Sequence, residues 1–147
     1  MLNDIARLFF QEIQNQLMFL VTEYKFAGPF SNFDENNDLY VYEVWFLGKN
    51  LAIEFILDWR DKSIDCYIAK LSKGIKPEGW LFDRQGNHIR VRLSDWVRNQ
   101  SVTPVRLFSK VDQRNFQEQI PIVIGDYVHI LRSYGSSILN DRNDIFL

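Results

Sequence analysis

The 147-residue chain has little cysteine and histidine, and it has no long apolar run. Its single cysteine, Cys66, excludes an internal disulfide and a zinc site built from several thiolates. Its two histidines, His88 and His129, fall in separate predicted elements, with no metal-ligand spacing and no recognisable cysteine–histidine pair. We therefore expect no metal and no cofactor.

The longest uninterrupted apolar run, Leu17 to Val21, is far too short to span a membrane. No basic segment precedes an apolar run near the N-terminus, so we expect no secretory signal. A soluble, cytoplasmic protein is the resulting expectation. The sequence also lacks a phosphate loop, a dinucleotide fingerprint and a nucleophile elbow, so we do not expect an enzyme.

The chain contains 46% hydrophobic and 15% aromatic residues, which is enough for one hydrophobic core. Helical spacing of apolar residues predicts a helix from Asn3 or Asp4 to about Tyr24. A Gly/Pro- and Asn/Asp-rich loop follows at 25–38, which Phe26, Phe30 and Phe33 are expected to pin to the body.

Alternating patterns then predict strands at about 39–47, 51–58 and 64–71, with shorter ones near 80–83, 88–93 and 105–108. Helical character returns after Asp112, with Pro121 starting or kinking a helix. The sequence therefore predicts one α+β domain over 1–147: an N-terminal helix, an antiparallel β-meander of about five strands, and C-terminal helices.

The central strands also predict how charge is placed. A two-residue turn at Gly48-Lys49 would set Glu43 directly opposite Glu54. Since side chains alternate along a strand, one face then collects only apolar residues: Tyr40, Tyr42, Val44, Phe46, Leu51, Ile53, Phe55 and Leu57, continued by Ile64, Cys66 and Ile68. The opposite face collects Glu43, Trp45, Glu54 and Asp58, joined by Asp65 and Tyr67.

Like charges directly opposite each other destabilise a sheet, so the pair Glu43 and Glu54 needs an explanation. One explanation is a basic partner within the fold, with Lys70, Arg90 or Arg92 as candidates. A second is a face that binds a cationic surface, with Trp45 and Tyr67 as aromatic anchors. A third is a catalytic carboxylate pair. Internal pairing of the two acids with Arg90 or Arg92 would remove the candidate binding site.

Charge is unevenly distributed along the chain. Residues 34–65 contain eight acidic and three basic residues, a net charge of −5, whereas residues 66–110 contain nine basic and three acidic residues, a net charge of +6. The basic segment is interleaved with aromatic residues, which favours an alternative function as a nucleic-acid-binding module that uses Lys76, Arg90 and Arg92. The overall pI near 5.7 argues against strong affinity for a phosphate backbone.

Four segments carry a resemblance to a known family: 22–26 (Thr-Glu-Tyr-Lys-Phe), 58–61 (Asp-Trp-Arg-Asp), 131–135 (Leu-Arg-Ser-Tyr-Gly) and 138–141 (Ile-Leu-Asn-Asp). In their order, the chain resembles small bacterial immunity proteins, including those paired with contact-dependent growth-inhibition toxins. The resemblance implies a non-enzymatic protein that neutralises a cognate toxin domain by binding it tightly. It also implies that the acidic face and the loop residues Asp34 and Glu35 are the contacts.

Overall fold

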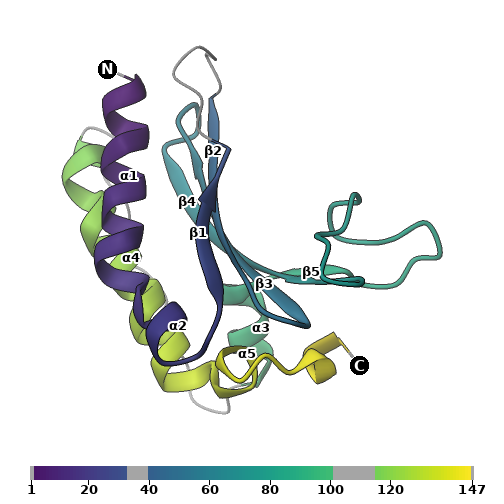
Figure 1. Cartoon of the computed structure of the whole chain (residues 1–147). Coiled ribbons are helices and arrows are strands. Elements are labelled where there is room, and N and C mark those ends of the chain that lie inside the picture. The colour runs from purple at the N-terminus through teal and green to yellow at the C-terminus, as the bar shows by residue number, and fades with distance from the viewer. Residues whose placement is uncertain (1, 33–39, 101–114, 147) are drawn as a thin grey trace.

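The structure is a computed structural model that describes residues 2–32, 40–100 and 115–146. Along the chain, the elements are α1 (Leu2–Leu17), α2 (Phe19–Thr22), β1 (Ala27–Ser31), β2 (Val41–Leu47), β3 (Leu51–Asp58), β4 (Ser63–Lys70), β5 (Arg90–Arg92), α3 (Leu93–Gln100), α4 (Phe116–Tyr134), α5 (Ser136–Leu139) and the 3₁₀ helix η2 (Asn143–Phe146). Figure 1 shows them in this colour order.

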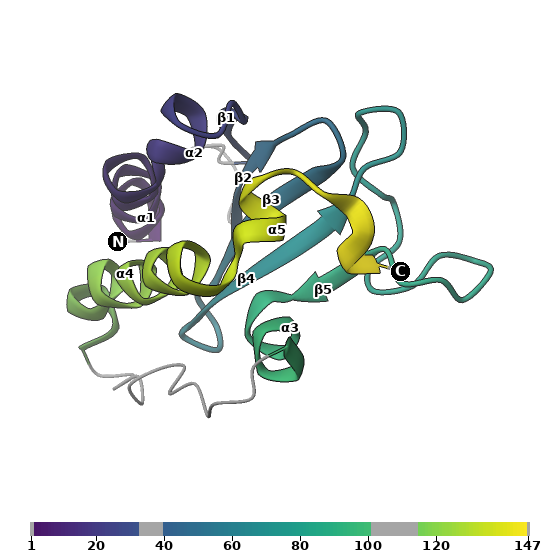
Figure 2. The same cartoon turned by 90° about the horizontal axis from the view of Figure 1, so that it is seen from below.

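The strands form one antiparallel sheet in the order β1-β2-β3-β4-β5. Helices α1 and α4 lie side by side against one face of this sheet (Figures 1 and 2). The predicted α+β class is therefore confirmed, with an N-terminal helix, a five-stranded meander and C-terminal helices.

The first strand of the meander is not one that the sequence predicted. The segment expected to be a loop contains β1, because Phe30 and Ser31 pair with Trp45 and Val44. Gly28 and Pro29 interrupt this pairing, and the register shifts between Ala27 and Phe30. An edge strand tolerates such residues because only one of its sides needs a hydrogen-bonded neighbour. Phe26 is buried, as expected of a residue that pins the segment. Phe30 is 42% exposed, so the expectation was wrong for that residue, and Phe33 lies outside the described residues.

Other element boundaries also differ from the expectation. The predicted first helix is broken at Met18, so that α1 and the one-turn α2 replace a single helix. The strand expected near 80–83 is only an isolated bridge between Phe82 and His88, and β5 spans just Arg90–Arg92. Pro121 lies inside α4 rather than at its start. The strand expected at 105–108 falls outside the described residues.

The core lies between the inner face of the sheet and the helices. The predicted apolar set is buried there, with one exception: Tyr40 is 54% exposed, so its assignment to the core was wrong. Phe55 packs edge-on against Tyr127 of α4, with ring centres 6.2 Å apart. The Tyr127 hydroxyl donates a hydrogen bond to the Ile64 carbonyl at 2.8 Å, which fixes α4 to β4.

The turn between β2 and β3 is held by the C-terminal segment. The Asp141 carboxylate accepts hydrogen bonds from the backbone N–H groups of Lys49, Asn50 and Leu51 at 2.5, 3.0 and 2.9 Å. A Cβ atom on Gly48 would lie 2.5 Å from a carboxylate oxygen of Asp141, so only glycine leaves room for this contact. The turn is therefore centred on Lys49 and Asn50.

Candidate interaction surface

The face of the sheet that α1 and α4 leave uncovered is called here the outer face. One row of directly paired residues crosses it from edge to edge: Phe30, Trp45, Glu54, Tyr67 and Arg92. The row is aromatic at three positions and has a carboxylate at its centre. The outer face therefore does carry Glu43, Trp45, Glu54, Asp58, Asp65 and Tyr67, as the alternation predicted.

The predicted cross-strand pairing of the two glutamates is wrong. Glu54 lies opposite Trp45, and Glu43 lies opposite Ile56. The reason is the position of the turn: the Gly48 N–H donates to the Leu51 carbonyl at 2.8 Å, so the turn lies one residue later than Gly48-Lys49. This moves the register by two residues, which preserves the face of every side chain but places the two glutamates diagonally.

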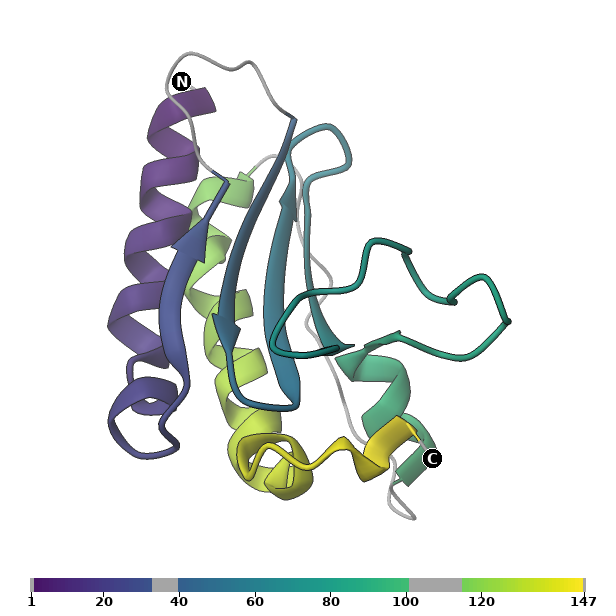
Figure 3. The same cartoon turned by 45° about the vertical axis from the view of Figure 1, so that its right-hand side comes forward.

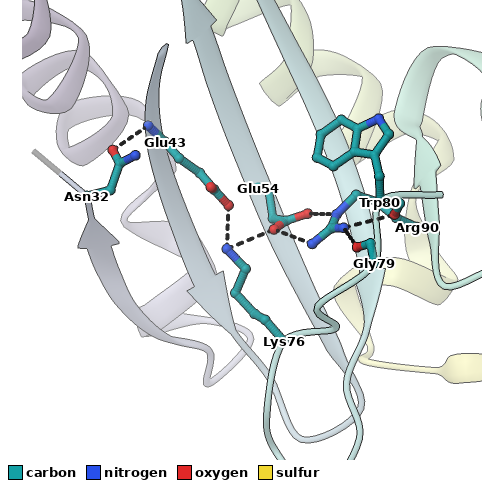
Figure 4. A network of polar contacts seen from close by, with 7 residues as sticks. All are labelled: Asn32, Glu43, Glu54, Lys76, Gly79, Trp80 and Arg90. Carbon is teal, nitrogen blue, oxygen red and sulfur yellow. Dashed lines mark hydrogen bonds and ion pairs between the residues drawn. The ribbon is translucent and has the colours of Figure 1, made fainter. Parts of the chain in front are cut away.

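Glu54 is fully buried, and two cations neutralise it. Arg90 donates from Nε to Glu54 Oε1 at 2.6 Å and from Nη2 to Oε2 at 3.1 Å (Figure 4). The Lys76 ammonium contacts Glu54 Oε2 at 2.8 Å and also contacts Glu43. Lys76 Nζ further lies 4.1 Å from the centre of the Trp45 ring, a cation–π contact. Together these contacts form an internal network between Glu43, Glu54, Lys76 and Arg90.

The pKa values of the two glutamates shift in opposite directions. Burial alone would raise the pKa of Glu54, but hydrogen bonds from Arg90, Glu43 and Lys76, together with the charge of Arg90, lower it overall. Burial and the contact with Glu54 raise the pKa of Glu43, and Lys76 offsets this only in part. Glu43 therefore takes up the first proton of the pair as the pH falls.

The network answers the question that the sequence left open about these acids. Glu54 pairs with Arg90, one of the three cations that the sequence offered, whereas Glu43 pairs with Lys76. Because Glu54 is 0% exposed, its carboxylate cannot reach a partner protein in this structure. Instead, the Glu54 carboxylate binds two cations of the same chain, Lys76 and Arg90.

The other candidate residues are placed as follows. Tyr67 is buried, with Trp80 packed on it at a ring-centre distance of 4.9 Å, and Trp45 is partly exposed. Asp65 is partly exposed and lies 3.8 Å from Arg92. Asp58 is the last residue of β3 and accepts a hydrogen bond from the N–H of Asp61, in the following turn, at 3.0 Å. Asp34 and Glu35 lie outside the described residues.

The segment between β4 and β5, residues 71–89, is called here the arm. It projects from the sheet on the side away from α1 and α4 (Figures 1 and 3). Lys76 and Arg90 attach it to the outer face: besides binding Glu54, Arg90 Nη1 donates to the carbonyls of Gly79 and Trp80 at 2.7 and 2.9 Å. The sequence did not predict this attachment, because Lys76 lies in a Gly/Pro/Lys loop with no strand pattern to place it.

The outer face and the arm, together called here the outer surface, expose large apolar side chains. Among the described residues, nine such side chains are exposed, and five of them lie on this surface: Phe30, Val41, Ile75, Trp80 and Phe82. Ile75 is 69% exposed and Trp80 is 51% exposed. Exposed apolar residues that share one side of a molecule favour an interaction site there more than single scattered ones do.

The surroundings of Arg90, His88 and Cys66 do not indicate a catalytic or binding site. Arg90 is buried, so it is not part of a solvent-exposed basic surface with Arg92. His88 packs against Phe82, with ring centres 4.4 Å apart. Cys66 is buried, and burial raises the pKa of its thiol.

Within the described ranges, no three His, Cys, Asp or Glu side chains are grouped closely enough to hold a metal ion. No helix in that same part of the chain is both long and apolar enough to cross a membrane.

Comparison of the chain with models of protein families, with curated proteins and with solved structures gave no match.

Proposed function

We propose that the chain is a non-enzymatic protein that binds another protein through its outer surface. Following the resemblance to immunity proteins, the proposed partner is a cognate bacterial toxin domain, which the chain neutralises in the cytoplasm by covering its active surface. The observation that supports this proposal most directly is the exposure of Phe30, Val41, Ile75, Trp80 and Phe82 on one side of the molecule. Large aromatic side chains with neighbouring arginine are the typical centre of a protein–protein interface.

The proposed mechanism is steric occlusion by this apolar and aromatic surface. Glu43 and Glu54 do not take part in this occlusion, because Lys76 and Arg90 neutralise both acids within the fold. In the proposed mechanism, the two acids instead hold the arm in position. The arm then presents Trp80 and Phe82 to the partner without first having to be ordered, which lowers the entropic cost of binding.

A neutralisation experiment tests the proposal. The product of a neighbouring toxin-like gene is expressed with and without the chain, and growth and co-purification are measured. We expect the wild-type chain to restore growth and to purify with the toxin in a stoichiometric complex. The double variant Trp80→Ala/Phe82→Ala should lose both effects, since truncating central aromatic anchors costs about 2 kcal/mol or more each.

Ile122 supplies the matched control, because it is equally exposed but lies on α4, on the helical side of the sheet. Ile122→Ala should neutralise like the wild type. Full neutralisation by Trp80→Ala/Phe82→Ala would contradict the proposed surface. Growth inhibition that the wild-type chain leaves unchanged would contradict the proposed function.

The second candidate function is nucleic-acid binding by the basic 70–110 segment. What favours it is the interleaving of the exposed cations Lys73 and Arg84 with Trp80 and Phe82. However, two of the three residues assigned to this function, Lys76 and Arg90, are held in internal ion pairs. Binding to generic RNA or DNA that weakens steeply with salt would support this candidate, and its absence at low salt would remove it.

A further inference from the structure

The arm contains a short β-hairpin near its start, residues 72–75, which is called here the first hairpin. Ser72 and Ile75 exchange two backbone hydrogen bonds of 3.0 Å. The φ angles of Lys73 and Gly74 are 52° and 76°, which is typical of the tight two-residue turn called type I′. Ile75 is 69% exposed, the largest exposed fraction among the large apolar side chains of the described residues. The first hairpin therefore presents one apolar side chain to solvent on a tight turn.

Lys76, the residue after Ile75, attaches the first hairpin to the outer face. Its ammonium lies between the carboxylates of Glu43 and Glu54, at 2.8 Å from Glu54 Oε2 (Figure 4). The same nitrogen lies 4.1 Å from the centre of the Trp45 ring. Because the Lys76 side chain is only 22% exposed, water screens these contacts less than it screens surface ion pairs. Three contacts of one side chain therefore fix the backbone directly beside Ile75.

The second hairpin of the arm, residues 79–89, is attached by a different side chain. Arg90 Nη1 donates to the carbonyls of Gly79 and Trp80 at 2.7 and 2.9 Å. The guanidinium of Arg90 also lies 4.9 Å from the centre of the Trp80 ring. None of these contacts involves Lys76, so each hairpin has its own cation as its attachment to the outer face.

The two cations share Glu54, but they bind it through separate hydrogen bonds. Arg90 donates to Glu54 from Nε and Nη2 at 2.6 and 3.1 Å, and replacing Lys76 leaves both bonds in place. The first hairpin, by contrast, would lose the contacts that attach it to the outer face. A two-stranded hairpin by itself is at best marginally stable in water. We therefore expect loss of Lys76 to free the first hairpin while the second stays in place.

We infer that Lys76 is a positioning residue that holds Ile75 in place as an anchor for the partner, separately from Trp80 and Phe82 in the second hairpin. This inference rests on the proposed function and divides the arm into two separately supported parts of the binding surface. An anchor that is ordered before binding loses less entropy when the complex forms. Lys76 should therefore strengthen binding without contacting the partner.

The first test uses the free ¹⁵N-labelled chain. Amide order parameters of about 0.85 indicate a rigid backbone, and values below about 0.6 indicate a flexible one. We expect the amides of Gly74 and Ile75 to be rigid in the wild type and flexible in Lys76→Met, whereas the amide of Ile89 stays rigid in both. Lys76→Arg, which keeps the positive charge, should restore rigidity. A rigid Ile75 amide in Lys76→Met, or an equal loss of rigidity at Ile75 and Ile89, would overturn the inference.

The second test measures binding of the purified product of the neighbouring toxin-like gene. Lys76→Met and Ile75→Ala should each weaken binding about tenfold, and so should the double variant, because Lys76 acts through Ile75. The losses caused by Lys76→Met and Trp80→Ala should instead multiply. The matched control Lys73→Met removes the same charge from the first hairpin and should bind within about twofold of the wild type. Multiplying losses for Lys76→Met and Ile75→Ala, or an equal loss in Lys73→Met, would overturn the inference.

Failure of this inference can be told apart from failure of the proposed function. If Lys76→Met frees the first hairpin as expected but the wild-type chain neutralises nothing, the attachment by Lys76 stands and the toxin assignment falls. If the wild-type chain neutralises the toxin but Ile75 stays rigid in Lys76→Met, the proposed function stands and the positioning role of Lys76 falls.

Discussion

Replacing Arg90 with methionine tests the network that fixes the arm. The guanidinium is almost fully buried, and it donates to both oxygens of Glu54 and to the carbonyls of Gly79 and Trp80. Removing one partner of a buried ion pair costs about 3–5 kcal/mol, because the remaining charge is left uncompensated. Here Lys76 remains 2.8 Å from Glu54 and offsets part of that loss. We therefore expect Arg90→Met to lower the free energy of unfolding by about 3 kcal/mol.

Urea unfolding followed by tryptophan fluorescence measures this loss. With a slope of about 1–3 kcal/mol per molar urea, the expected midpoint falls by roughly 1–3 M. Arg92→Met is the matched control, since the Arg92 side chain is 46% exposed, lies 3.8 Å from Asp65 and donates to the Tyr67 hydroxyl at 3.1 and 3.4 Å. Contacts of a half-exposed side chain of this kind contribute about 1 kcal/mol, so this control should lose clearly less stability than Arg90→Met. Equal midpoints for Arg90→Met and Arg92→Met would refute the argument that the network stabilises the fold.

Three further variants test other contacts in the same unfolding assay. Burial raises the pKa of Glu54, but the neighbouring cations lower it further, so that the pKa in the folded protein lies below its ordinary value of 4.5. The Glu54 carboxylate therefore stabilises the fold fully above pH 4.5 and progressively less below that pH. The stability gap between wild type and Glu54→Gln should therefore narrow as the pH falls below 4.5, and a widening gap would contradict the ion-pair account. Tyr127→Phe removes the hydrogen bond to Ile64 and should cost about 1–2 kcal/mol, whereas an unchanged midpoint would mean that the bond contributes nothing. Asp141→Ala leaves the β2–β3 turn without its acceptor and should cost about 2 kcal/mol, with faster hydrogen exchange of the Leu51 amide; unchanged exchange would exclude this capping role.

The central strands could be predicted because their signal is local. Alternation places Val44, Phe46 and Phe55 on one face whichever turn joins the strands, and a shift of two residues leaves those faces unchanged. The register between β2 and β3 could not be predicted in the same way, because it depends on whether Gly48 belongs to the turn or pairs with Leu51. Asp141 stabilises the observed turn from the far end of the chain, and no local pattern reveals that contact.

The network around Glu54 could be predicted only in part. Arg90 falls on the outer face by strand alternation and was therefore among the expected partners, although it lies 36 residues away in the sequence. Lys76 was not expected, because nothing in a Gly/Pro/Lys loop fixes the direction in which a side chain points. The first strand was missed for a similar reason: Gly28 and Pro29 predict a turn, and only pairing with β2 makes the segment an edge strand.

Amide hydrogen exchange of the chain, alone and bound to the proposed toxin partner, tests the proposed binding surface most directly. We expect binding to slow exchange most in the arm, at amides near Trp80 and Phe82, and to leave exchange on the exposed side of α4 around Ile122 unchanged. Protection confined to α1 and α4, with exchange in the arm unaltered, would contradict the assignment of the outer surface as the binding surface.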